Sequence, residues 1–411
     1  MLSNRDATVR KIIPYYVAFC WFAAITSSFI TTIITHDKWI AGDWLINYEG
    51  GFVRRGIIGQ VIYELSELTA ISPGTFVFLI LLSLFSLYYY CINYLLKKQE
   101  HILPYVFLVF APFTLAFQVT SPEDIRKPAI CYALLALTIV FTHKLSKKHF
   151  NIFFYALMVI GFPIVLLAHE ATMIFVPYFL ITYLYVNKVT IKSFIKMIVI
   201  SIPAAVVFWG VIIFARYIPL DQMLMIKKSL AALGYTFKEA GSIEFLSCDL
   251  QVIISLKYII YYSLGLALAC LAFIPIRSRL AYIFKDKVLL LLFLAAVVMT
   301  LTIMAITVDW GRDICWNLIP LFLLTLIKQD DNKTEENLKE SKLYHVNGKK
   351  LVIACIAYLT LWNMSALDPE DRMFIPLAAA KLIIHMDDLD AYYKPEVGKN
   401  ICEQTNYLPF K

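Results

Sequence analysis

The sequence predicts an all-α protein, a polytopic bundle of transmembrane helices. Of its 411 residues, 60% are hydrophobic and 16% are charged, and the mean hydropathy is +0.71. Soluble domains are about 45–50% apolar and about 25% charged, so a single water-soluble core could not bury this many apolar side chains. The same composition excludes an intrinsically disordered chain, a disulfide-rich secreted module and an ordinary cytosolic enzyme.

Eleven apolar segments account for the predicted spans. A hydrocarbon core of about 30 Å requires roughly 20 apolar residues per helix. The segments are residues 12–35, 74–96, 102–119, 128–142, 151–168, 171–186, 197–215, 251–275, 288–307, 317–328 and 351–366. Those at 128–142 and 317–328 are short, which leaves tilted, flank-extended and re-entrant paths open for them. Residues 1–366 are thus expected to form one integral membrane domain, followed by a short extracytoplasmic tail at 367–411.

Basic residues indicate how the bundle is oriented. Lys and Arg are more numerous in the loops on the N-terminal side of the membrane, for example at Lys97, Lys98 and Lys144. Cytoplasmic loops carry such an excess, so we expect a multi-pass protein of the inner (plasma) membrane with a cytoplasmic N-terminus. The basic residues are spread between apolar segments rather than gathered in one patch, which argues against a nucleic-acid partner.

With this orientation, most of the polar clusters fall on the outer side. A charge at a membrane boundary usually contacts headgroups or solvent. However, the A-H-E-A turn has almost no loop around it, so its two polar side chains need partners. Acids and arginines gathered at one rim predict a site that binds an anion and moves a proton. The candidates are Asp43, Glu49, Arg54 and Arg55 in the first outer loop, Arg126 in the second, His169 and Glu170 in the third, and Asp309 and Arg312 in the fifth.

The first outer loop carries the most specific pattern. Gly50 and Gly51 permit a sharp turn through which a ligand could approach the main chain. After it, residues 52–68 have apolar side chains at helical spacing, which predicts an interfacial amphipathic helix with Arg54 and Arg55 in its first turn. Two interpretations remain open: the arginines contact lipid headgroups, or they hold a diphosphate, whose oxygens guanidinium groups bind bidentately.

A multi-span protein with an acid and then an interfacial helix in its first outer loop resembles the GT-C superfamily of membrane glycosyltransferases. The layout also resembles the Wzy-type polymerases of surface polysaccharides such as O-antigen or capsule. The resemblance implies transfer of sugar from a polyprenyl phosphate or diphosphate at the outer face, with Asp43 or Glu49 as the base. This sequence departs from those families in having no D-x-D motif in the first loop, no large soluble tail domain and no R-x10-G pair.

Glycosyl transfer also defines the expected roles of the other residues. It needs a base for the attacking hydroxyl and cations for the departing diphosphate. The expected catalytic residues are Asp43, Glu49, His169, Glu170 and Asp309, and the expected phosphate ligands are Arg54, Arg55, Arg126 and Arg312. We expect no cofactor and no metal site, because His169 has no H-x-x-H or cysteine partner. The expected partners are the polyprenyl-linked saccharide, membrane lipid and other polysaccharide-assembly proteins.

Two other classes of function stay open. A transporter or flippase for an anionic lipid-linked substrate would place charges near the bilayer midplane, where only Lys257 is expected. A polysaccharide acyltransferase would need a histidine beside an acid, as in His169–Glu170. A disulfide between two of Cys248, Cys315 and Cys402, all expected outside, is a further possibility.

Overall fold

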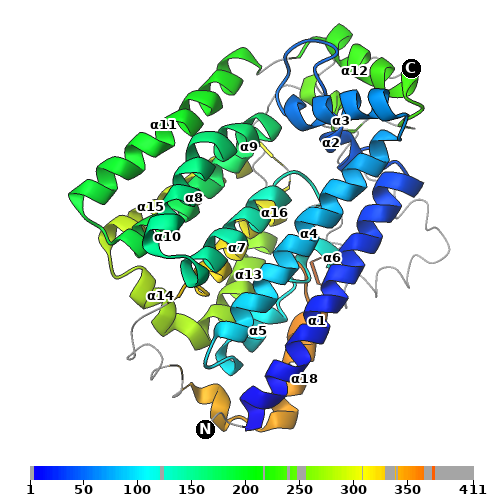
Figure 1. The fold of residues 1–411 in the computed structure, drawn as a ribbon. Coiled ribbons are helices and arrows are strands. Elements are labelled where there is room, and N and C mark those ends of the chain that lie inside the picture. The colour runs from blue at the N-terminus through cyan, green and yellow to red at the C-terminus, as the bar shows by residue number, and fades with distance from the viewer. Residues whose placement is uncertain are drawn as a thin grey trace, which may run out of the picture.

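The chain folds as an all-α bundle (Figure 1). The computed structural model describes residues 4–120, 125–215, 218–237, 241–247, 256–307, 309–328, 338, 341–364 and 373–374. Every regular element within these ranges is a helix, which confirms the predicted class. The tail predicted at 367–411 lies outside the described residues apart from 373–374.

Six helices are long and apolar enough to cross a membrane. Several of them contain π or 3-10 turns, so one span can combine more than one helical element. Three of the six are single helices: α4 (Pro73–Lys98), α11 (Ile191–Phe214) and α15 (Lys287–Met304). The other three join several elements: Arg5–Ile34 joins α1 (Asn4–Phe29) and η1 (Ile30–Ile34), Lys147–Ala168 joins α8, η4 and α9, and Tyr258–Ile283 joins α13, η7 and α14. The chain is therefore a membrane protein in composition and in helix length.

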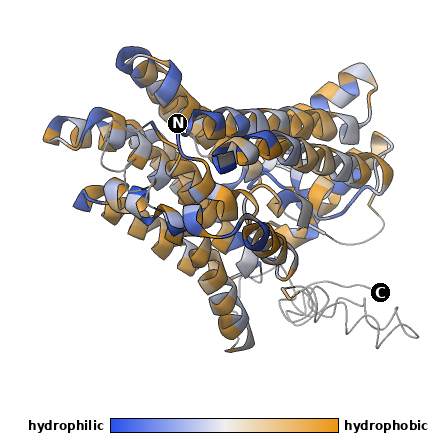
Figure 2. Cartoon of the chain, turned by 90° about the horizontal axis from the view of Figure 1, so that it is seen from below, coloured by the Kyte–Doolittle hydropathy of each residue, from blue (hydrophilic) through white to orange (hydrophobic). Residues whose placement is uncertain are grey.

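Four shorter helices complete the bundle: α7 (Ala129–Lys144), α10 (Val176–Asn187), α16 (Trp310–Leu324) and α18 (Gly348–Thr360). Helix α10 lies in the core, with nine of its twelve residues buried. By contrast, α11 exposes large apolar side chains such as Trp209 and Ile213, and hydrophobic residues make up most of the long helices in Figure 2. The outer helices thus present to lipid the apolar surface that a soluble protein would bury.

The segment predicted to span at 102–119 is not one continuous helix. It consists of η2 (Leu103–Tyr105), α5 (Val106–Val109) and α6 (Phe117–Thr120), joined by irregular backbone. A proline within a helix removes one hydrogen bond and clashes with the preceding turn, and this segment contains Pro104 and Pro112.

Other helices supply hydrogen bonds to this broken segment. The Asp6 carboxylate accepts from the amides of Ile102 (3.1 Å) and Leu103 (3.0 Å), and the Tyr89 hydroxyl donates to the Leu115 carbonyl (2.8 Å). Irregular backbone at membrane depth is tolerated where protein surrounds it in this way.

At one end of the bundle lie α2 (Ile40–Trp44), α3 (Gly56–Thr69) and α12 (Leu220–Ala232), as Figure 1 shows. Helix α3 packs on α4 and α9 and exposes Val61, Leu65 and Leu68 along one stripe, as expected of an interfacial helix. It begins at Gly56 rather than at residue 52, because Arg55 is its N-cap in a left-handed conformation (φ 67°). Arg54 and Arg55 therefore precede the helix, and their predicted place in its first turn is wrong.

The packing of α3 depends on a glycine. A Cβ atom at Gly59 would lie 1.8 Å from the Ile46 carbonyl oxygen, a backbone atom that cannot move aside cheaply. We expect Gly59→Ala to lower the free energy of unfolding by about 1–3 kcal/mol, the usual cost of overpacking. Thermal unfolding of the purified protein in detergent measures this change.

The matched control is Gly210→Ala in α11, where a Cβ atom meets no heavy atom within 4 Å. Alanine is the better helix former, so this variant should be unchanged or more stable by up to about 1 kcal/mol. Equal melting temperatures for the two variants would show that α3 does not pack closely on residue 46.

Candidate functional site

Arg55 joins two loops that the sequence predicts to be the first and third outer loops. Its Nε donates to both carboxylate oxygens of Glu170 (3.1 and 3.0 Å), and its Nη2 donates to Oε1 at 2.7 Å. The Nη1 atom of the same guanidinium lies 3.7 Å from Asp43 Oδ1. One planar cation therefore connects α2, the start of α3 and the start of η5 (Glu170–Phe175), an arrangement that suits the planar, two-pronged guanidinium of an arginine.

Asp43 and Lys127 belong to the same cluster, and both are completely buried. The backbone amide of Lys127 donates to Asp43 Oδ2 (3.4 Å), and its ammonium donates to the carbonyl of Arg55 (2.7 Å). Burial acts to raise the pKa of Asp43, but the cations Lys127 and Arg55 outweigh it and hold that pKa below its usual value. Burial lowers the pKa of Lys127 to about 8.

His169 and Glu170 differ in charge although they are neighbours. Burial favours a raised pKa for Glu170, yet Arg55 lowers it far below the usual range, so the carboxylate is ionised. Burial and then Arg55 lower the pKa of His169 to about 3, so its imidazole is neutral. Its ring meets Trp316 edge-on at 6.2 Å between centroids. The turn thus contributes one negative charge, which Arg55 balances.

A second ion cluster lies beside the first. Asp309 pairs with Arg312, three residues along the chain, and its Oδ2 lies 3.9 Å from Arg126 Nη1. The guanidinium of Arg126 lies over the Trp39 ring (5.7 Å), and that of Arg312 lies over Trp316 (5.5 Å). The Trp316 ring contacts both Arg312 of this cluster and His169 of the first. The two clusters therefore form one site, which we call the outer ion cluster after the predicted side of its loops.

Arg54 is the least satisfied cation of the outer ion cluster. Its side chain is nearly buried, and its contact with Glu170 is 4.0 Å long, the outer limit of an ion pair. Its Nε is buried and finds no hydrogen-bond partner among the described residues. A buried guanidinium with so little compensation is unfavourable unless an anion completes its shell.

The outer ion cluster combines cations with several acids. Among the described residues, its cations are Arg54, Arg55, Arg126, Lys127 and Arg312, and its acids are Asp43, Glu170, Asp309 and the neighbouring Asp313. The weakly paired Arg54 is the cation that favours an anionic ligand.

Glu49 and the glycine turn lie outside this cluster. Glu49 is exposed, and its carboxylate accepts a hydrogen bond from Gln60 (3.0 Å). A Cβ atom at Gly50 would lie 2.4 Å from the carbonyl oxygen of Gln222. Position 50 therefore needs glycine because α12 packs on it, and the approach of a ligand to this turn stays a prediction.

Asp313 belongs to the site but was not among the predicted catalytic residues. It lies in the first turn of α16, before the apolar stretch at 317–328, and its side chain is completely buried. Thr307 donates to Oδ2 (2.6 Å), while Oδ1 has no hydrogen-bond partner among the described residues. Burial raises its pKa to about 7. Lys127 was missed in the same way, although S-P-E-D-I-R-K-P and D-W-G-R-D both stand out as polar islands.

The site holds no arrangement typical of a bound metal. Within the described ranges, no group of three or more His, Cys, Asp and Glu side chains is placed to hold a metal ion. Cys315 is buried in α16, and Cys248 and Cys402 lie outside the described residues, so the possible disulfide is untested.

No protein-family model, no curated protein and no solved structure matches this chain. Arguments about its function therefore depend on the chemistry of the outer ion cluster and on the bundle that holds it.

The two neighbouring arginines should respond differently to lysine. Arg55→Lys removes a bidentate buried pair, and we expect it to lower the free energy of unfolding by about 1–3 kcal/mol. Arg54→Lys keeps a cation near Glu170 and loses no short hydrogen bond, so the change should stay within about 0.5 kcal/mol. Thermal unfolding of both purified variants tests the contrast, which equal losses of stability would contradict.

Proposed function

We propose that this protein is a membrane glycosyltransferase or polysaccharide polymerase that acts at the extracytoplasmic face on polyprenyl-(di)phosphate-linked sugars. The observation that carries the proposal is the outer ion cluster, where, among the described residues, five cations gather and the buried Arg54 has only one long contact with a carboxylate, that of Glu170. A diphosphate would supply the anion that Arg54 lacks. The cluster adjoins the start of interfacial helix α3, at the depth where a carrier lipid presents its phosphate groups.

The two arginines before α3 have separate roles in this proposal. Arg55 is held by Glu170 and Asp43, so it fixes the loops in place. Arg54 has unused donors and is the proposed phosphate ligand, with Arg126 and Arg312 on the other side of the cluster. Cations held in place before the reaction stabilise the charge that develops on the departing phosphate.

Asp313 is the best candidate for the base. A base works well when its pKa is near the operating pH, and burial brings the pKa of Asp313 to about 7. Asp43 and Glu170 have lowered pKa values and are weak bases. As an acceptor hydroxyl attacks the anomeric carbon, its proton would pass to Asp313, and the bond to the lipid (di)phosphate would break with the electron pair on the phosphate oxygen.

The competing classes have less support. A polysaccharide acyltransferase would use Glu170 to orient His169, but the carboxylate is engaged by Arg55. A transporter or flippase would need charges at the midplane, and the side chain of Lys257 lies outside the described residues. Charged groups of the described site gather at one end of the bundle, which favours an enzyme at that face.

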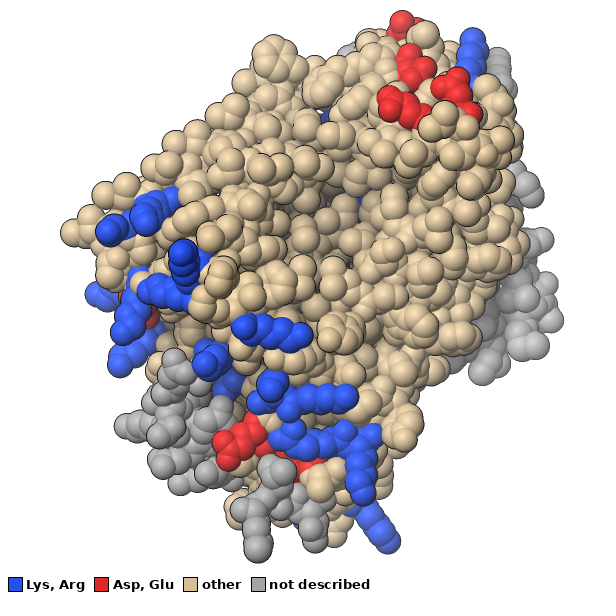
Figure 3. All heavy atoms as spheres, viewed as in Figure 1, with Lys and Arg blue, Asp and Glu red and all other residues tan. Residues whose placement is uncertain are grey.

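The proposal includes eleven spans and a cytoplasmic N-terminus. Beyond the six long helices, the apolar segments 128–142, 171–186, 317–328 and 351–366 and the broken segment 102–119 would supply the other five, which leaves Glu170 and Asp313 outside the spans. Figure 3 supports the orientation: on the face it shows, Lys and Arg gather toward the end with the N-terminus, and acids gather over the opposite end. An odd number of spans would leave the tail at 367–411 outside.

Activity tests the proposed roles. In cells that lack the native gene, Asp313→Asn should reduce surface polysaccharide synthesis by about a hundredfold or more, the scale of general-base catalysis. Arg54→Lys should reduce it by roughly tenfold, because lysine loses the planar fork. With membranes and lipid-linked sugar in vitro, the rate should rise with pH through about 7, since Asp313 must lose its proton to act as the base.

Glu49→Gln is the matched control, because Glu49 is an exposed acid of the same loop outside the cluster. It should retain near wild-type activity, and Asp43→Asn should mainly destabilise the protein. Normal polysaccharide from Asp313→Asn and Arg54→Lys, both present at wild-type levels, would refute this mechanism.

Labelling of single cysteines tests the orientation. Ser72 precedes α4, Lys148 lies in the first turn of α8, and both are exposed. In intact spheroplasts, a membrane-impermeant maleimide should label Ser72→Cys and spare Lys148→Cys until the membrane is opened. The reverse pattern would place the outer ion cluster on the cytoplasmic side and overturn the use of an extracytoplasmic substrate.

A further inference from the structure

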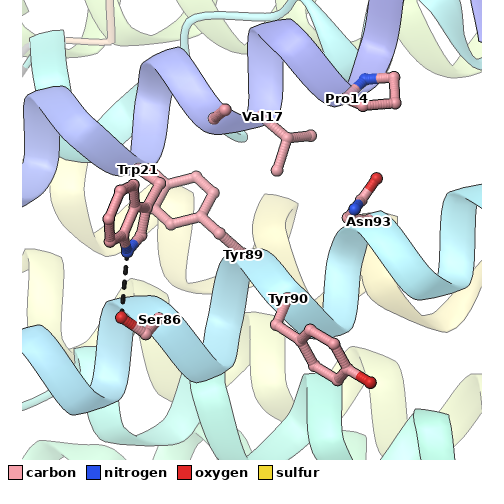
Figure 4. Close-up of a pocket in the computed structure, with 8 residues that line it drawn as sticks. Pro14, Val17, Trp21, Ser86, Tyr89, Tyr90 and Asn93 are labelled. Atoms are coloured by element: carbon pink, nitrogen blue, oxygen red, sulfur yellow. Dashed lines mark hydrogen bonds between the residues drawn. The ribbon is translucent and has the colours of Figure 1, made fainter. Parts of the chain in front are cut away.

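A groove lies between α1 and α4, on the outside of the bundle and away from the outer ion cluster. Its volume is about 270 Å³, and its wall includes Val17 and Ala18 of α1 and Tyr89 of α4 (Figure 4). The Trp21 indole donates to the hydroxyl of Ser86 (3.0 Å) and closes one end. Nearby residues such as Phe19 are well exposed, so the groove opens toward lipid.

Polar groups occur at one depth in this otherwise apolar groove. The Asn93 amide projects from α4 into the space between the helices (Figure 4), and its Oδ1 is buried without a hydrogen-bond partner among the described residues. Opposite it, Pro14 has no N–H to donate, which leaves the carbonyl one turn earlier in α1 without its helical partner. An acyl chain alone would leave these polar groups unsatisfied.

Basic residues lie one helical turn beyond this polar depth. Lys97 follows Asn93 by four residues and Arg10 precedes Pro14 by four, which is about 6 Å along each helix axis. Arg10 donates to the carbonyl oxygens of Lys97 (3.3 Å) and Glu100 (2.6 Å), so it closes this end of the groove. Neither Arg10 nor Lys97 forms an ion pair with a carboxylate of the described residues, which leaves their charge for an anion.

We propose that this groove binds an anionic glycerophospholipid from the leaflet at the N-terminal end of α1. Its phosphate lies against Arg10 and Lys97, an ester group meets the Asn93 amide one turn deeper, and one acyl chain runs past Ala18 toward Trp21. The order of cation, amide and apolar wall matches the order of phosphate, ester and chain in such a lipid. The inference does not depend on the proposed enzymatic activity, whose site lies at the opposite end of α1.

Trp21 provides the readout, because it is part of the wall. The full-length protein is placed in nanodiscs with increasing fractions of phosphatidylglycerol or phosphatidylcholine that carry the same brominated acyl chains, which quench tryptophan on contact. The difference between wild type and Trp21→Phe isolates the signal of residue 21. We expect brominated phosphatidylglycerol to quench Trp21 at a lipid fraction about fivefold lower than the fraction of brominated phosphatidylcholine that gives the same quenching. A difference of this size is the effect of about one basic contact.

Three variants test the assignment. Lys97→Gln should abolish most of the preference for phosphatidylglycerol, whereas Lys192→Gln, an exposed lysine at the start of α11, should leave it intact. Ala18→Leu should fill the groove and weaken quenching by both lipids. The proposal fails if both lipids quench Trp21 equally, if Trp21 is not quenched at all, or if Lys192→Gln removes the preference as fully as Lys97→Gln.

Discussion

The buried ion pair between Arg55 and Glu170 is the contact on which the outer end of the protein depends. Burying two charges costs several kcal/mol for each ion, and only good geometry with further hydrogen bonds offsets that cost. Here the pair is bidentate, and Asp43 and Lys127 extend it on both sides. Since Arg55 is also the N-cap of α3, the same contact sets where this helix begins and how the turn at Glu170 is held. The outer ion cluster therefore forms only when these loops are held together.

Much of this architecture could be predicted from the sequence because it follows from composition. A chain this apolar must face lipid, and in lipid the backbone must satisfy its own hydrogen bonds, which leaves helices. The meeting of Asp43, Arg55 and Glu170 could be predicted because charges between apolar segments need partners. The start of α3 could not be predicted, since it depends on a residue in the left-handed backbone conformation that nothing in the local sequence requires. The break between residues 103 and 117 was also not predicted, because the segment is continuously hydrophobic. Its two prolines were the signal that could have indicated a break.

The different roles of the acids could not be predicted from the sequence, for another reason. Asp309 and Asp313 are one helical turn apart, yet Asp309 is held by arginines while Asp313 lies in a dry site against Thr307. Glu49 looked equivalent to Asp43, but its loop turns it to solvent, where Gln60 binds it. What separates these carboxylates is the surroundings contributed by other helices. Those surroundings, through burial and nearby charge, decide which acid is a counter-ion and which can accept a proton.

The broken segment between α4 and α7 also bears on how the chain is made. Two residues that bond to this segment, Asp6 on α1 and Tyr89 on α4, are synthesised before the segment itself. Another contact, from the Tyr105 hydroxyl to the Thr325 carbonyl (3.2 Å), must wait until more than 200 further residues are synthesised. A non-helical stretch cannot stay in hydrocarbon alone. The hydrogen bonds with the first two long helices can therefore form before the contact with Thr325, the C-cap of α16.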